Sequence, residues 1–113
     1  MKNEFNELRN YFNEAKRRNW NDGYNPYILY NNSKKAIIKI EAIKSNLNNT
    51  EEIEFCDYII KELQETSILL KLYSLSDKRD IVIGDDMLFN KVRDNVFINL
   101  SRFLNYFDEL EED

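Results

Sequence analysis

Residues 50–76, TEEIEFCDYIIKELQETSILLKLYSLS, carry the widest apolar stripe of the chain and decide the fold. Apolar or small side chains recur there every three or four residues: Ile53, Cys56, Ile60, Leu63, Ser67 and Leu70. This spacing is typical of one face of an α-helix, and the flanking apolar residues make the face wider than a surface helix needs. We therefore predict a central helix over 50–76, capped by Thr50. On this stripe Cys56 is expected to be a small buried hydrophobe.

Three further segments have the same period and predict helices over 3–19, 33–48 and 86–110. Their apolar positions are, in chain order, Phe5, Leu8, Phe12 and Ala15; Ala36, Ile40, Ile43 and Leu47; and Leu88, Val92, Val96, Leu100, Phe103 and Phe107. Four such helices with short connections predict an all-α fold, a single antiparallel bundle that forms one domain over 1–113.

The segment before the second helix allows more than one structure. The pair Asn25-Pro26 offers a capping side chain followed by proline at the first helical position, which would start a helix there. The run Asn-Asn-Ser at 31–33 forms helices poorly, so that 27–30 could instead be extended. In that alternative 27–30 pairs with 81–83 as a short two-stranded ribbon, which we rank below a loop because isolated ribbons are weak.

The charges divide the chain into two unlike halves. Over 113 residues the formal net charge is −5. Residues 1–49 carry nine basic and five acidic side chains, whereas residues 50–113 carry seven basic and sixteen acidic ones. Such asymmetry indicates halves that fold against each other with complementary surfaces, which we favour, or an acidic face that binds a basic partner.

The residue inventory excludes several classes of chemistry. There is no histidine, which removes Ser-His and Cys-His nucleophilic pairs and His-bearing metal sites. The lone Cys56 forms neither an intramolecular disulfide nor a thiolate cage. We therefore expect a protein that is not an enzyme and that uses no cofactor or metal. The charged start MKNEFNELRN and the lack of a long apolar run predict a cytoplasmic protein without a membrane span.

Aromatic side chains gather beside two arginines in the segment 17–30, RRNWNDGYNPYILY. Such residues dominate the binding energy of protein interfaces, because they bury large areas at little cost in entropy. The same mixture stacks on unpaired bases, and it also serves to seal the open end of a bundle. The candidate partner-binding residues of this segment are Arg17, Arg18, Trp20, Tyr24, Tyr27 and Tyr30.

Acidic side chains follow the predicted central helix, among them Glu51 and Glu54. Helical enzymes that bind magnesium hold it with carboxylate pairs on two facing helices, and this chain has no convincing second pair. We therefore interpret the acids as a solvated face. Glu51 and Glu54 are also candidates for steering the protein toward a partner with a basic surface.

Residues 91–99, KVRDNVFIN, are similar to a motif of the helical HEPN domains. There an Arg near the start of a late helix is followed by a polar residue and, one to two turns later, by a His. Arg93 and Asp94 match the first two positions, and Asn99 stands where the His would be. The resemblance covers that one helix and implies an association with RNA or with a toxin–antitoxin or defence system. Because the His is missing, it does not imply RNA cleavage by that family's route.

Composition and patterning predict a small acidic, non-catalytic helical protein that acts by protein–protein interaction. Asn, Ile and Lys are abundant while Gly, Pro and Ala are scarce, which follows AT-rich codons. We favour an inhibitor, immunity or anti-defence factor from an AT-rich bacterium or phage, an interpretation that rests on the inferred source and not on particular residues. The alternative is a degenerate HEPN-like domain that uses Arg93 and Asn99 to contact RNA, which the negative net charge disfavours. We expect a monomer or a homodimer.

Overall fold

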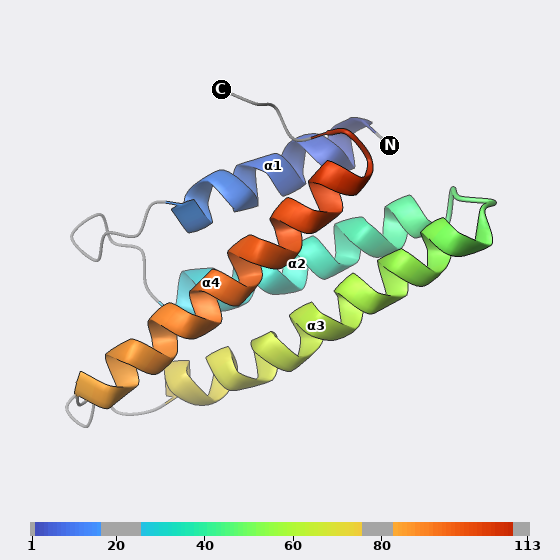
Figure 1. The fold of residues 1–113 in the computed structure, drawn as a ribbon. Helices are drawn as coiled ribbons and strands as arrows, with labels where there is room; N and C mark the ends of the chain where they lie inside the picture. Colours follow the sequence, from blue (N-terminus) through green and yellow to red (C-terminus); the bar gives the residue numbers. More distant parts are fainter. Residues whose placement is uncertain (1, 17–25, 76–82, 110–113) are drawn as a thin grey trace.

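Four α-helices make up the described part of the chain. The structure, a computed structural model, describes residues 2–16, 26–75 and 83–109. Over these ranges there is no strand, and the helices are α1 (Lys2–Lys16), α2 (Pro26–Lys44), α3 (Thr50–Leu75) and α4 (Ile83–Tyr106). Successive helices run in opposite directions (Figure 1). The predicted all-α antiparallel bundle is confirmed.

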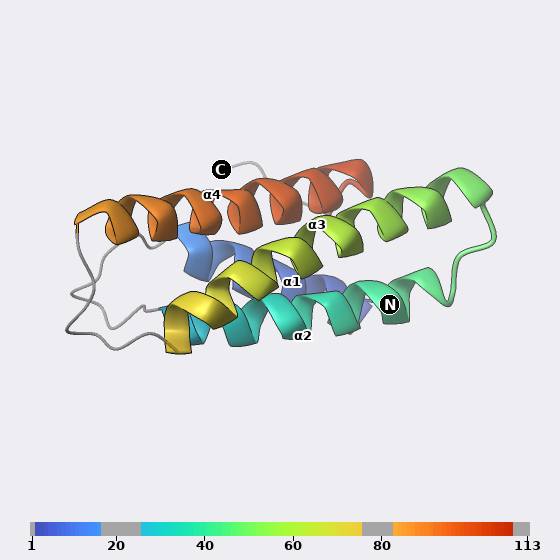
Figure 2. The ribbon, with the colours of Figure 1, turned by 90° about the horizontal axis from the view of Figure 1, so that it is seen from below.

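Each helix packs on its two neighbours around the bundle, and α2 and α4 also meet across it. Over the described residues α1 and α3 each pack on α2 and on α4, whereas α1 and α3 make no direct contact. The interface between α2 and α3 is the most extensive. Figure 2 shows α3 slanting across the bundle, from the level of α4 at its start to that of α2 near its end. None of the described helices is at once long enough and apolar enough to cross a membrane.

One hydrophobic core is shared by all four helices. Its members are Phe5, Leu8 and Phe12 of α1, Leu29, Ala36, Ile40 and Ile43 of α2, Cys56, Ile59, Ile60 and Leu63 of α3, and Val92, Val96, Leu100, Phe103 and Leu104 of α4. Most of these positions belong to the apolar stripes that the sequence predicts. A helix with one apolar face removes that face from water only by packing on other helices, which is why the stripes meet.

Phe103 joins three helices at the end of the bundle where α4 ends. Its side chain is fully buried, and its ring centroid lies 6.1 Å from that of Phe5 on α1 and 6.2 Å from that of Phe55 on α3. The ring of Phe107, one turn further along, lies 5.0 Å away. Tyr106 extends the cluster by stacking on Phe55 at 4.2 Å. Aromatic pairs at these distances add to the stabilisation that comes from burial alone.

The helix α2 begins at Pro26, the start that the Asn25-Pro26 pair offers, rather than at residue 33. Residues 27–30 are helical, so the alternative ribbon between 27–30 and 81–83 is wrong. Leu29 accounts for the difference, because its side chain is fully buried in the shared core. Ser33 lies inside the helix and donates its hydroxyl to the carbonyl of Leu29 at 2.9 Å. Burial of a leucine outweighs the helix propensity of the Asn-Asn-Ser run, which is weaker than that of Ala by roughly 0.5 kcal/mol per residue.

The connection between α2 and α3 is shaped by side-chain hydrogen bonds. The cap of α3 is Asn49 and not Thr50, since the Oδ1 atom of Asn49 accepts a hydrogen bond from the amide of Glu52 at 3.1 Å. The helix α2 ends at Lys44, earlier than predicted. The two side chains that follow it donate to the carbonyl of Ala42 at 2.7 and 3.1 Å, which ends the helical ladder.

The helix α4 differs from its prediction at both ends. It begins at Ile83 instead of 86, and it ends at Tyr106, one turn before the predicted end. Asp108 adopts a left-handed backbone conformation with φ of 55°. The amides of Asp108 and Glu109 then bond to carbonyls of the last turn at 3.1 and 2.8 Å. This is a Schellman closure with aspartate where glycine is usual.

We expect the substitution Phe103→Ala to lower the free energy of unfolding by about 3–5 kcal/mol, because it opens a cavity among three helices. Urea denaturation followed by circular dichroism measures the change. Ile98→Ala, at a side chain of the same helix that is 42% exposed, is the control and should cost less than about 1 kcal/mol. A loss below about 1.5 kcal/mol at Phe103 would show that the aromatic cluster does not hold these helices together.

Candidate functional site

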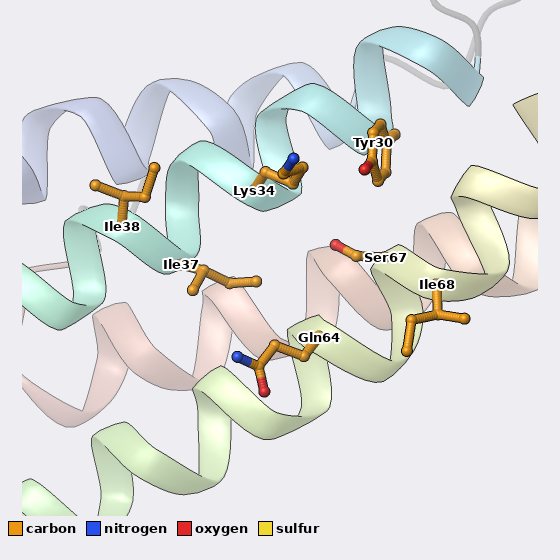
Figure 3. Close-up of a pocket in the computed structure, with 7 residues that line it drawn as sticks. All are labelled: Tyr30, Lys34, Ile37, Ile38, Gln64, Ser67 and Ile68. Carbon is orange, nitrogen blue, oxygen red and sulfur yellow. The ribbon is translucent and has the colours of Figure 1, made fainter.

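A groove of about 540 Å³ lies between α2 and α3 (Figure 3). Four residues of α2 and three of α3 line it: Tyr30, Lys34, Ile37, Ile38, Gln64, Ser67 and Ile68. Grooves of this volume are large enough to receive a ligand or a segment of another protein. It is therefore the candidate functional site.

The helical register of α2 places its lining residues on one side. Tyr30, Lys34 and Ile37 follow one another at three- and four-residue spacing and so lie above each other along the helix. Because α2 starts at Pro26, Tyr30 lies on this regular helical surface. A helix that started at residue 33 would have left Tyr30 out of the groove.

Two strongly exposed isoleucines border the groove on opposite sides. Ile38 of α2 is 61% exposed and Ile68 of α3 is 62% exposed, and each points away from the centre of the groove (Figure 3). Single exposed apolar side chains are common on protein surfaces. Two that border one hollow place exposed apolar area on both of its sides, where one bound segment could cover both.

Polar and apolar side chains share the groove. Tyr30, Ile37 and Ser67 point into the space between the two helices, while Lys34 lies along α2 beside Tyr30 (Figure 3). The Nζ atom of Lys34 lies 5.3 Å from the centroid of the Tyr30 ring, within the range of a cation–π contact. Ser67 is 7% exposed, and its hydroxyl oxygen is buried without a hydrogen-bond partner.

A second, smaller hollow of about 350 Å³ lies on the other side of Ile38, between α1 and α2. Its lining residues are Glu7, Tyr11, Lys35, Ile38 and Lys39. The Nζ atom of Lys39 pairs with the Oε2 atom of Glu7 at 2.8 Å, so the charge of this lysine is already compensated. Ile38 therefore forms a ridge between the two hollows.

The predicted partner-binding segment is only partly described. Tyr30 lies in the groove, half-buried against the core. Tyr27 belongs to α2, and only its place in that helix is described. The other candidates, Arg17, Arg18, Trp20 and Tyr24, lie outside the described residues.

Glu51 and Glu54 lie in the first turns of α3, far from the groove. Both are exposed, as a solvated face requires. The ring of Phe55 stacks on that of Tyr106 at 4.2 Å, so the first turns of α3 lie beside the end of α4. Burial, and then the carboxylates of Glu51 and Glu52, raise the pKa of Tyr106. About 13 residues of α3 separate Glu54 from Ser67, roughly 20 Å along the helix. The structure therefore does not bring the acidic candidates together with Tyr30.

Arg93 and Asn99, the candidate RNA-binding residues, are buried on α4, at 5% and 3% exposure. Arg93 pairs with its neighbour Asp94 at 3.7 Å, and its Nε atom has no hydrogen-bond partner. The side-chain amide of Asn99 donates to the carbonyl of Asn95 at 2.9 Å. Neither side chain presents a surface that RNA could reach.

The described residues form neither a site with a reactive nucleophilic cysteine nor a metal-binding site. Cys56 is fully buried, and burial raises the pKa of its thiol to about 11, so the reactive thiolate is scarce at neutral pH. Over the described ranges no three acidic or cysteine side chains gather as metal ligands would.

The groove residues other than Tyr30 were not singled out as site candidates by sequence analysis. The sequence did contain a signal for the groove, because Ile38 and Ile68 lie outside the apolar stripes that form the core faces of their helices. An isoleucine out of phase with a helix's core face has no core to enter. Ser67 gave a second signal, as a polar residue within the apolar stripe of α3.

No protein-family model, curated protein or solved structure matches this chain. The geometry of the described residues is therefore the basis for the functional proposal below.

We expect Cys56 to resist Ellman's reagent in the native protein at about pH 8, because the buried thiol stays protonated. Unfolding in denaturant should make the thiol react fully and at once. The time course of absorbance in the two conditions measures this. Prompt labelling of the native protein would show that the α3 side of the core opens to solvent.

We expect Arg93→Met to leave the free energy of unfolding unchanged within about 1 kcal/mol, or to raise it, because a buried, poorly paired charge is replaced by an apolar side chain of similar length. Asp94 keeps access to water, at 42% exposure of its side chain. Urea denaturation of both proteins measures the difference. A loss above about 2 kcal/mol would mean that Arg93 contributes an essential interaction inside the bundle.

Proposed function

We propose that the protein acts by binding another protein, with an amphipathic helix of the partner seated in the groove between α2 and α3. Ile38 and Ile68 carry the proposal, since two exposed isoleucines border the same hollow. Two adjacent antiparallel helices leave a trough that accepts a third helix, as in the helix-in-groove mode of recognition. Apolar side chains of the partner helix would cover both isoleucines and remove them from water.

The role that we propose is that of a non-catalytic inhibitor, immunity or anti-defence factor, which works by occupying its target. The residue inventory supports it, because the chain has no histidine and its one cysteine is buried. The AT-rich codon preference supports a bacterial or phage source. The RNA-associated alternative receives no support from the placement of Arg93 and Asn99, both of which are buried.

Two of the predicted partner-binding regions relate differently to the groove. The segment with Trp20 and Tyr24 directly precedes α2 in the sequence, so these residues stay candidates for the same interface. Glu51 and Glu54 lie at the other end of α3. Attraction of a basic partner by these acids is therefore a separate proposal, independent of the groove.

We expect the double variant Ile38→Ser/Ile68→Ser to lose the protein's partner. The tagged full chain is incubated with extract of the source cell, treated with nuclease, and its bound proteins are identified by mass spectrometry. Wild type should retain one stoichiometric protein, and the double variant should retain it at least about tenfold less well, because both anchors of the interface are gone.

Ile98→Ser is the matched control, since it removes an exposed isoleucine of α4 that does not line the groove. It should keep the partner, and circular dichroism should show all variants to be folded. Equal retention by the double variant would overturn the groove as the binding site. If the bound proteins are lost after nuclease treatment, the result would favour the RNA-associated hypothesis instead.

A further inference from the structure

We propose that the centre of the groove receives a carboxylate, carried as an Asp or Glu side chain on the partner's helix between aliphatic residues. This inference rests on the proposed function and specifies its partner. Lys34, Tyr30 and Ser67 form the receptor, with Ile38 and Ile68 holding the apolar residues on either side of the acid. The groove thus selects a helix that is apolar along one face and acidic at one position.

Ser67 gives the first reason, because its hydroxyl behaves unlike the other buried hydroxyls of the bundle. Ser33 donates to the carbonyl of Leu29 and Thr66 donates to the carbonyl of Glu62, each at 2.9 Å and each four residues back. This local bond is the usual way in which a helical hydroxyl is satisfied. The hydroxyl of Ser67 has no partner although it is buried. It lines the groove and points toward α2 (Figure 3). Because the oxygen is covered in the free protein, an incoming acceptor satisfies it only after the groove side chains over it move aside.

Lys34 gives the second reason, because its charge is uncompensated. Lys39 and Lys44, on the same helix, pair with Glu7 and Asp57 at 2.8 and 2.6 Å. Lys34 has no acidic partner among the described residues. Its Nζ atom instead makes a cation–π contact with the ring of Tyr30. Lys35, which also has no acidic partner among the described residues, lines the smaller hollow instead, so Lys34 is the unpaired lysine of α2 that lines the groove, although the chain as a whole has a net charge of −5. A charge-assisted bond from an ammonium and a hydroxyl to one carboxylate is stronger than a bond between neutral groups.

Ile38 and Ile68 show why the carboxylate belongs to a protein helix and not to a small acid. They point outward, on either side of the groove (Figure 3). A small anion held by Lys34 and Ser67 would leave both isoleucines exposed to water. A helix laid along the groove would contact these two polar side chains and both isoleucines at once.

The experiment selects partners from a displayed library of randomised helical peptides, with the full chain as bait. Wild type should enrich peptides that have one Asp or Glu between Leu, Ile or Phe residues at helical spacing. The Lys34→Gln bait should enrich apolar peptides without the acid. In titrations with one selected peptide, Lys34→Gln and the Glu→Gln change in the peptide should each weaken binding roughly tenfold, and the two changes together should weaken it little further.

Two variants separate a receptor from a merely structural position. Ser67→Ala should weaken binding of the selected peptide severalfold, while urea denaturation should show it to be no less stable than wild type, because the hydroxyl that it removes has no partner. Arg102→Gln removes the same unit of charge from an exposed position of α4 and should leave binding unchanged.

The outcomes distinguish this inference from the proposal on which it rests. In one outcome, wild type and Lys34→Gln bind the same apolar peptides without an acid, and Ile38→Ser/Ile68→Ser does not bind them. This result would overturn the carboxylate receptor but leave the groove as a docking site. If none of the groove variants changes the binding of the selected peptides, both the carboxylate receptor and the groove as a docking site would be overturned. Sedimentation could also show that the free protein is a dimer and that Ile38→Ser/Ile68→Ser is a monomer. A second copy of the chain would then occupy the groove, which would also overturn the inference.

Discussion

The packing of Phe103 is the constraint on which the rest of the structure depends. Its ring contacts rings of α1 and α3 as well as that of Phe107, so these helices cannot slide past one another without opening a void in the core. Arg9 adds a polar contact at the same end of the bundle. Its guanidinium donates to the backbone carbonyl of Glu109 at 2.6 Å and pairs with the carboxylate of the same residue at 2.9 Å. Together these contacts hold α1 against the end of α4.

Away from this aromatic end, the described part of the core includes polar side chains. Ser33, Ser67 and Arg93 are buried there, and the rings of Phe12 and Phe97 stack at 4.8 Å. The helix α2 is held in place by ion pairs from both sides, to Glu7 of α1 and to Asp57 of α3. The pair of Lys44 with Asp57 joins the basic half of the chain to the acidic half, as does that of Arg9 with Glu109, whereas the pair of Lys39 with Glu7 lies within the basic half. Lys34 and Lys35 have no acidic partner among the described residues, and Lys34 lines the groove, about three turns of α2 before the pair of Lys44 with Asp57.

Sequence periodicity anticipated the core but not the boundaries or the groove. Phe5, Ile40, Leu63 and Leu100 are buried because each lies on a stripe with the helical period, a property of one segment alone. The start of α2 was misplaced because the burial of Leu29 depends on the other three helices. Pro26 is a local signal for the earlier start, but the helix propensity of the Asn-Asn-Ser run points the other way, and only the contact of Leu29 decides between them. Asn49 and Thr50 are both good caps, and only the turn before α3 decides between them.

By itself, the sequence predicted the four amphipathic helices that the described residues form and the core that they share. It also holds no histidine and no second cysteine for an intramolecular disulfide. These are consequences of residue type and of spacing within a segment, which need no knowledge of neighbours. Only the tertiary structure decided that Ile38 and Ile68 border one hollow, that Ser67 lacks a partner, and that Arg93 and Asn99 are buried. Each of these depends on which helices become neighbours and at what level they meet, because exposure and hydrogen bonding belong to the space between elements.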